Sequence, residues 1–426
     1  MARRSFAPTD SSLSFLDEQY SNTLVKKNTA AHSGLLLITL AYIGFVSLGL
    51  PDAVIGVAWP SVRDTFRLPQ EAAGLVFAAS GVGYFATSFL SGRLTHAVGV
   101  GLLLAASTAL VAAAMLGFAF SPFWALFVAC AAVHGLGSGA IDAGLNGYAA
   151  HYLSARHMNW LHACYCFGAM LGPLVMTAVL TSGRHYNAGY LIVGGAIASL
   201  SIVFLVTGPQ WGQASAAADA TQGHTGVWQT LRHTAVVLQM IVFFIYTGIE
   251  IAVSQWAFTV LTELRGVESA RAGVAVSVYW GSIGVGRVVF GLIADRVGID
   301  HLLRYCLLAA ASGLGLFAVA LGPTAAYAGL TLAGVGLAPV FPSLMTRTPQ
   351  RLGTALSAHA IGFQVGAAMI GSAVVPATLG LMAGAIGLEA IPVGTVILAV
   401  ILWLLHETLI RRPDAGTSDV AASRAS

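Results

Sequence analysis

The chain has 426 residues, of which 57% are hydrophobic and only 9% are charged, and its formal net charge is +3. Soluble domains carry roughly 25% charged residues, so this composition excludes a soluble enzyme, a disordered chain and a nucleic-acid-binding protein. A helix that crosses a bilayer needs about 20 apolar residues, and the apolar total is enough for about twelve such spans. We therefore expect a polytopic membrane protein.

The N-terminal half of the chain predicts a tail followed by six spans. Residues 1–33 are polar without an apolar core, and they are expected to form a disordered cytoplasmic tail. The first apolar run is long enough to span, so it predicts a permanent helix rather than a cleaved signal. Residues 34–208 form the first predicted bundle, with apolar runs near 34–58, 70–91, 99–120, 122–150, 158–181 and 187–208.

The C-terminal half repeats this organisation after a break. Residues 209–233 are rich in Gly, Ala, Ser and Thr and are typical of a flexible cytoplasmic linker. Residues 234–408 form the second predicted bundle, with runs near 234–261, 270–294, 301–321, 325–345, 354–382 and 385–406. Residues 409–426 form a second cytoplasmic tail. Continuous apolar runs exclude a β-barrel, so the expected fold is all-α with twelve transmembrane helices.

The distribution of basic residues predicts the orientation. If the N-terminus is cytoplasmic, fourteen Lys and Arg residues lie on the cytoplasmic side and five on the opposite side. The positive-inside rule then places both termini in the cytoplasm. The expected location is a bacterial inner membrane or a plasma membrane.

An offset of 199 residues relates the two halves. This shift carries Gly92 and Gly99 onto Gly291 and Gly298, and it carries three further glycines, in the fourth and fifth spans, onto glycines in the tenth and eleventh. Asp52 of the first span lands one residue from Glu250 of the seventh. The halves therefore predict two pseudo-symmetric six-helix bundles, an arrangement found in transporters.

A loop motif carries a family resemblance. The segment Gly291-Leu-Ile-Ala-Asp295-Arg296-Val-Gly298 resembles the cytoplasmic Gly-x-x-x-Asp-Arg-x-Gly motif of the major facilitator superfamily. The first-half copy keeps its glycines but has His96 and Ala97 in place of the acid and the base. The resemblance implies a gating role for these four residues: Gly291, Asp295, Arg296 and Gly298. The alternative is a tight turn beside an ordinary interfacial acid.

Shorter segments resemble the fucose permease-related branch, whose members are typically proton-coupled sugar symporters. They are Ala140–Asn146, Asn159–Ala163, Tyr246–Glu250 with Gln255 and Trp256, and Ala338–Pro342. By this resemblance, Asp142 and Asp52 fall where the branch places its fourth-helix and first-helix acids.

Charged side chains inside lipid are expensive and usually functional. We predict that the protonatable residues for proton coupling are Asp52, Asp142 and Glu250. Two of them have an alternative: a structural hydrogen bond for Asp142, and hydration near the interface for Asp52. Arg287 either pairs with an acid of the other half or extends to the cytoplasmic surface.

The predicted substrate-binding residues combine hydrogen-bonding groups with an aromatic plate. They are Asn146, His162, Gln255 and Trp256. Packing is the alternative for Trp256, and an ordinary hydrogen bond is the alternative for His162.

The leading functional hypothesis is proton-coupled uptake of a small neutral polar solute, a sugar or polyol, by a monomer that alternates its access. Efflux of drugs or secondary metabolites is the first alternative, because Gly168-Ala-Met-Leu-Gly172-Pro173 resembles a drug–proton antiporter motif. The further glycines of that motif are missing, and close packing of the fifth span with a kink is the favoured interpretation of the segment. A non-transporting solute sensor is a second alternative. No metalloprotease, nucleophile or phosphate-loop motif occurs, so no enzyme, cofactor or metal is expected. The solute, the direction and the coupling ion stay open.

Overall fold

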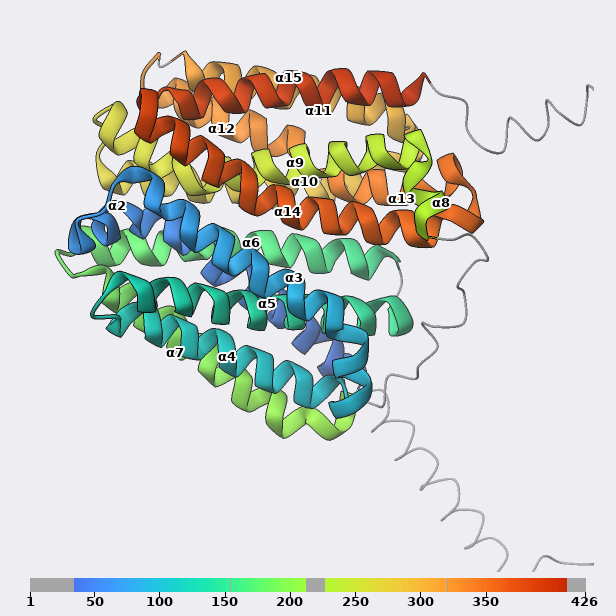
Figure 1. The fold of residues 1–426 in the computed structure, drawn as a ribbon, viewed down its shortest axis with the longest axis horizontal. Helices are drawn as coiled ribbons and strands as arrows, with labels where there is room; N and C mark the ends of the chain where they lie inside the picture. The colour runs from blue at the N-terminus through green and yellow to red at the C-terminus, as the bar shows by residue number, and fades with distance from the viewer. Residues whose placement is uncertain (1–33, 154, 212–226, 320, 412–426) are drawn as a thin grey trace, which may run out of the picture.

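The computed structural model describes residues 34–153, 155–211, 227–319 and 321–411 (Figure 1). The predicted tail 1–33 and most of the predicted segments 209–233 and 409–426 lie outside the described residues. In the described part, twelve helical segments are long and apolar enough to cross a membrane. The all-α prediction and the number of spans are confirmed.

The first six spans form one bundle. The first span, Gly34–Phe66, ends in helix α2, and five further spans follow. The elements are α2 (Val54–Phe66), η1 (Gln70–Ala72), α3 (Ala73–Val98), α4 (Val100–Phe120), α5 (Trp124–Tyr152), α6 (Ala155–Thr181), α7 (Tyr186–Thr207) and η2 (Gly208–Trp211).

The last six spans form the second bundle, preceded by the short helix α8 (Val227–Arg232). Its elements are α9 (Thr234–Thr259), the π-helical turn η4 (Val260–Leu264), α10 (Ser269–Val297), α11 (Ile299–Ala318), α12 (Pro323–Leu337), α13 (Val340–Leu352), α14 (Thr354–Ile386) and α15 (Ala390–Ile410).

Glycines at equivalent points of the two halves explain the tight connections. Gly99 joins α3 to α4 with φ of 77°, and Gly298 joins α10 to α11 with φ of 81°. This left-handed conformation is easy only for glycine, so a single residue can reverse the chain. Deeper in the bundle, Gly137 packs against residues 107 and 111, and Gly336 packs against residues 306 and 310, again 199 residues later.

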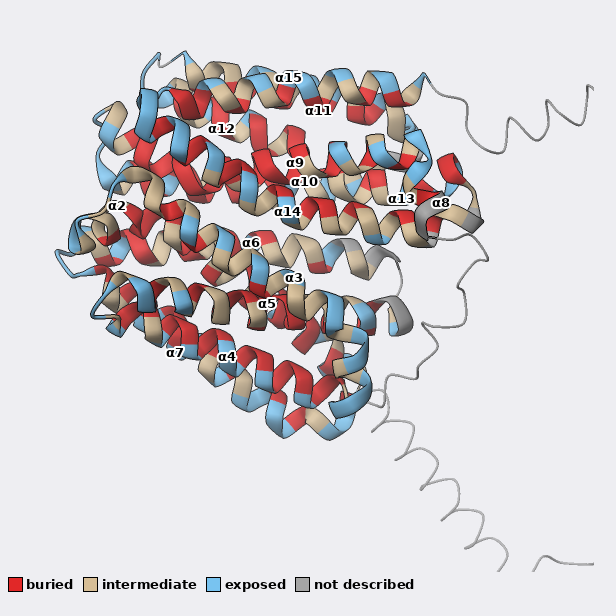
Figure 2. Ribbon diagram, in the orientation of Figure 1, coloured by how far each residue is buried: buried red, intermediate tan, exposed pale blue. Residues whose placement is uncertain are grey.

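The two bundles lie side by side with their helices roughly parallel (Figure 1). Figure 2 shows buried residues where helices face one another and exposed residues on the outer faces of both bundles. Because the spans alternate in direction, the molecule has two ends. We name them the Phe66 end, where the first span finishes, and the Gly34 end, where it begins.

Close contacts between the halves gather toward the Phe66 end. A Cβ atom at Gly56 would lie 2.8 Å from the Ser254 carbonyl oxygen, so α2 and α9 touch through their backbones. At the tip, the Arg63 guanidinium lies 2.9 Å from the Glu263 carboxylate. The helix pairs α3 with α14 and α6 with α10 complete the interface.

Two spans are broken near their middles. A turn at Ala53 interrupts the first span directly after Pro51 and Asp52, and residues 338–339 separate α12 from α13. Broken helices at this depth are tolerated where they line a cavity, since the freed backbone groups need polar surroundings. Both breaks adjoin the pocket described next.

Candidate functional site

A cavity of about 230 Å³ lies between the two halves, near the middle of the spans. Its wall is mostly apolar, with polar groups from both bundles. The polar lining residues are Asp52, Ser80, Tyr84, His134, Asp142, His162, Tyr165, Tyr190, Tyr246, Thr247, Glu250, Gln255, Arg287 and Ser372. An apolar pocket with a few convergent polar groups is the usual form of a small-molecule site.

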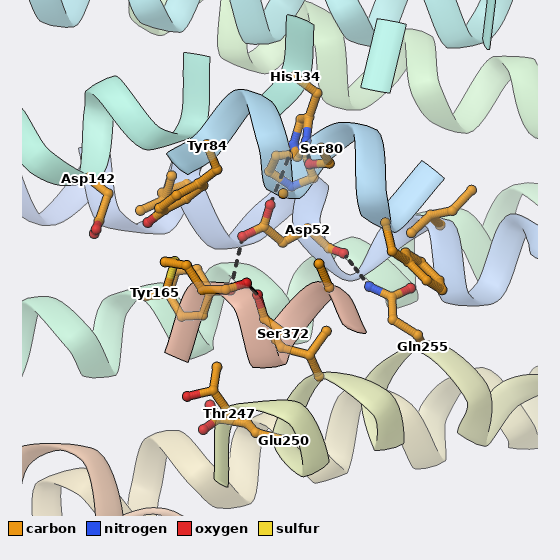
Figure 3. Close-up of a pocket in the computed structure, with 18 of the residues that line it drawn as sticks. Asp52, Ser80, Tyr84, His134, Asp142, Tyr165, Thr247, Glu250, Gln255 and Ser372 are labelled. Atoms are coloured by element: carbon orange, nitrogen blue, oxygen red, sulfur yellow. Dashed lines mark hydrogen bonds and ion pairs between the residues drawn. The ribbon is translucent and has the colours of Figure 1, made fainter. Parts of the chain in front are cut away.

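Asp52 is held by residues from three other helices (Figure 3). The Tyr165 hydroxyl donates to its Oδ2 at 2.9 Å, and the His134 Nε2 lies 3.4 Å from its Oδ1. From the other half, the Gln255 amide donates to the Asp52 backbone carbonyl at 3.0 Å. The helix break that follows Asp52 therefore places its carboxylate inside the cavity rather than at a hydrated interface.

Asp142 lies farther toward the Gly34 end on α5. Its carboxylate accepts a hydrogen bond from the Asn146 amide at 2.8 Å and another from the Tyr84 hydroxyl. Asn146 was predicted to bind substrate, but it is not among the residues that line the cavity. One helical turn after Asp142, it supports that carboxylate instead.

Glu250 has a cation partner that the sequence did not predict. The Arg287 guanidinium of α10 lies 3.0 Å from the Glu250 carboxylate of α9, and both side chains are buried. Arg287 also donates to the His162 carbonyl at 3.2 Å and to the Cys166 sulfur at 3.1 Å, both across the interface. Extension of Arg287 to the cytoplasmic surface is therefore excluded.

The predicted substrate residues divide into two groups. Gln255 lines the cavity, and so does His162, whose ring packs between Phe45 and Phe341. Trp256 does not, because its ring is fully buried between helices and its Nε1 donates to the Pro376 carbonyl at 2.9 Å. Trp256 therefore lies where a packing residue lies, as the alternative interpretation expected.

Nine of the polar cavity residues were not among the predicted site residues, and four of these nine surround the two acids of the first half: Ser80, Tyr84, His134 and Tyr165. Ser80 and Tyr84 are one helical turn apart on α3, and Tyr165 is three residues after His162 on α6. Their spacing on one helical face was visible in the sequence. Nothing there distinguished these side chains from ordinary packing residues, because their partners come from distant segments.

The gating motif is described only in part. Gly298 makes the tight turn and Gly291 and Arg296 are exposed, whereas the Asp295 side chain lies outside the described residues. The neighbouring acid Asp300 has cation partners: its carboxylate lies 2.8 Å from Arg347 and 2.6 Å from Arg351, both on α13. These three residues all belong to the second half.

The glycines of the fifth-span motif are packing residues. A Cβ atom at Gly168 would lie 2.0 Å from the Val46 carbonyl oxygen, and one at Gly172 would lie 2.2 Å from that of Leu50. The motif therefore lets α6 touch the backbone of the first span.

Comparisons with known proteins agree with this architecture. The chain is 23% identical to bypass of stop codon protein 6 of Saccharomyces cerevisiae, over 88% of this chain and 83% of that protein. It is 22% identical to human sodium-dependent glucose transporter 1 (80% of this chain, 72% of that protein) and 24% identical to a glucose/galactose transporter of Brucella abortus (87% and 92%).

Solved structures share the fold. A crystal structure of a mutant form of the nucleoside transporter NupG superposes with a TM-score of 0.73 at 13% identity, covering 87% of this chain and 98% of that one. FucP in its outward conformation superposes with a TM-score of 0.61 at 17% identity, covering 88% and 99%. The sequence model of the Major Facilitator Superfamily matches residues 41–376. The chain therefore belongs to the Major Facilitator Superfamily and is a multi-pass membrane transporter rather than an enzyme.

Proposed function

We propose that this transporter carries a small neutral polar solute, a sugar or polyol, in symport with protons. The observation that supports it best is a set of four buried polar atoms, on residues that line the cavity, without a hydrogen-bond partner among the described residues. They are the Tyr190 hydroxyl, the Thr247 hydroxyl, the Gln255 Oε1 and the Arg287 Nε. Buried polar groups left unpaired are costly, and a solute with several hydroxyls could pair with both the donors and the acceptors in this set.

The charge of the cavity argues against an anionic solute. Arg287 is the one Lys or Arg among its described lining residues, and Glu250 already neutralises it. An organic acid or phosphate would have to approach Asp52 and Asp142 without a free cation to pair with. A neutral solute avoids this repulsion.

Proton coupling is assigned to the first half. Within the described residues, no Lys or Arg forms an ion pair with Asp52 or Asp142. An uncompensated carboxylate in an apolar site is expensive, and a bound proton or small cation removes that cost. Because Arg287 compensates Glu250, we assign Glu250 to solute binding and the coupling protons to Asp52 and Asp142.

The transport cycle follows from the interface. The positive-inside distribution favours the Gly34 end as cytoplasmic, and the close contacts between the halves lie toward the Phe66 end. This conformation would be closed to the outside. Rocking of the two bundles would open the Phe66 end and separate Arg63 from Glu263. The cavity is complete within one chain, so a monomer is sufficient.

The test is uptake into proteoliposomes. Labelled neutral sugars, polyols and nucleosides are compared with cationic drugs, with an imposed pH gradient, a sodium gradient or neither. We expect a sugar or polyol to accumulate only with the pH gradient. Accumulation driven by sodium alone would overturn proton coupling, and transport restricted to drugs would overturn the solute class.

A further inference from the structure

We propose that His134 and Asp52 form a carboxylate–imidazole pair that holds the coupling proton jointly. The proposed function assigns the coupling protons to Asp52 and Asp142. The pair adds His134 to the residues that take part in proton transfer during the transport cycle. This inference rests on the proposed function and assigns a proton-sharing partner to one of its carboxylates.

The geometry of the pair is compact. The His134 Nε2 on α5 lies 3.4 Å from the Asp52 Oδ1 of the first span, and the His134 side chain is only 10% exposed. On its other side, the His134 Nδ1 lies 3.2 Å from the Ser80 hydroxyl oxygen of α3. A hydrogen on Nδ1 donated to Ser80 leaves Nε2 as the acceptor of the ring. The Asp52 Oδ1 and the Ser138 hydroxyl both lie 3.4 Å from this nitrogen, so a proton on the Asp52 carboxyl can pass to Nε2 when the Ser138 hydroxyl turns away.

Among the side chains that surround Asp52, the His134 imidazole is the nearest one that can accept a proton. The groups that face the pair from neighbouring helices are hydroxyls and one further acid: Ser80 and Tyr84 of α3, Ser138 and Asp142 of α5, Tyr165 of α6 and Tyr190 of α7. From α4 come only Met115 and Phe118, which are apolar. Arg287, the cation of the other half, is occupied by Glu250.

The proton step balances without another reactant. A proton from the open side forms an O–H bond at the Asp52 carboxylate. Passage to His134 breaks that bond and forms an N–H bond at Nε2, which leaves a carboxylate beside an imidazolium. Both protonated forms of the pair are neutral overall, whereas the unprotonated pair carries one negative charge. Sharing the proton therefore removes the uncompensated buried charge in either form.

Substitution separates this role from a purely structural one. His134→Gln keeps hydrogen-bonding groups but cannot carry a proton at this position. We expect accumulation driven by a pH gradient to fall about tenfold or more, the scale of losing a proton-transfer group, and to fall further than exchange of labelled for unlabelled solute does. His359→Gln, which removes a histidine outside the cavity that stacks on Phe363, is the matched control. Wild-type accumulation in His134→Gln would overturn the proposal.

A second experiment, by infrared spectroscopy, does not depend on transport. It therefore tests the His134–Asp52 pair independently of the proposed function. Infrared difference spectra of purified protein follow the carboxylic acid C=O band across a pH series, and Asp52→Asn identifies the Asp52 band by its loss. We expect His134→Gln to move the titration midpoint of this band by about one pH unit, as loss of a close charge partner does. An unmoved midpoint would overturn the pair even in a functional transporter. If wild-type protein accumulates no solute under a pH gradient, the proposed function fails, while this experiment still decides the pair.

Discussion

The Arg287 guanidinium and the Glu250 carboxylate lie 3.0 Å apart, with side chains only 8% and 6% exposed. The pair joins α10 to α9 in the second half, and its arginine also bonds to α6 in the first half. One buried cation thus holds the second bundle together and contacts the other bundle at the level of the cavity. Any movement of the halves must change its hydrogen bonds.

Glu250→Gln should destabilise the protein strongly. The substitution leaves Arg287 buried without its counter-ion, which costs about 3–5 kcal/mol. Thermal unfolding of the purified protein measures the effect. The matched control is Glu268→Gln, which removes the acid of an exposed pair with Arg271; an exposed pair contributes roughly 0–1 kcal/mol. Equal unfolding temperatures for the two variants would contradict the buried pairing.

Asp142→Asn should uncouple transport without stopping it. The amide cannot take up a proton, but it keeps the size of the side chain and can still accept from Tyr84. We expect accumulation under a pH gradient to disappear while solute exchange continues. Paired accumulation and exchange assays in proteoliposomes distinguish the two. Asn146→Ala is the companion variant, because it removes the other hydrogen bond to this carboxylate but leaves the acid. Undiminished accumulation in Asp142→Asn would remove this residue from the coupling mechanism.

The sequence predicted the architecture and the acids but few of their partners. Twelve spans and the turns at Gly99 and Gly298 follow from local rules: apolar length and the conformational freedom of glycine. Asp52, Asp142 and Glu250 stood out because charge inside a span is rare. Arg287 was noticed for the same reason, yet its partner depends on how α9 faces α10, which no local pattern encodes.

Aromatic residues were the least predictable part of the site. Trp256 and Tyr165 both occur in apolar helices with polar neighbours, and only three-dimensional packing separates them. Trp256 faces Phe77 and α14, whereas Tyr165 reaches the cavity and donates to Asp52. A helical face that is polar in sequence can still face another helix in the folded protein.

Cysteines at positions 74 and 377 should lock the Phe66 end. A Cβ atom at Gly74 would lie 3.3 Å from the Ala377 Cβ across the interface, close to the roughly 3.5–4.5 Å of disulfides. We expect Gly74→Cys with Ala377→Cys to cross-link under oxidation and to stop transport, and reduction should restore it. Each single cysteine variant should transport under both conditions. Full transport by the cross-linked protein would contradict rocking of the halves.

Gly168→Ala should show that the fifth-span motif is a packing device. The new methyl group would lie 2.0 Å from the Val46 carbonyl oxygen, and overpacking of this kind costs about 1–3 kcal/mol. Gly195→Ala on α7 is the control, since no atom lies within 4 Å of the added methyl group. Thermal unfolding should separate the two variants by several degrees. Equal unfolding temperatures for the two variants would contradict the claim that Gly168 is needed for the close approach of α6 to the first span.

The most direct test of proton symport is the internal pH of sealed proteoliposomes, followed with a trapped dye while solute is added outside in sodium-free buffer. The proposed mechanism predicts that a transported sugar or polyol acidifies the lumen in wild-type protein, and that Asp52→Asn abolishes the acidification while exchange of labelled solute persists. Entry of the solute without a change of internal pH, or entry only after sodium is added, would contradict the mechanism.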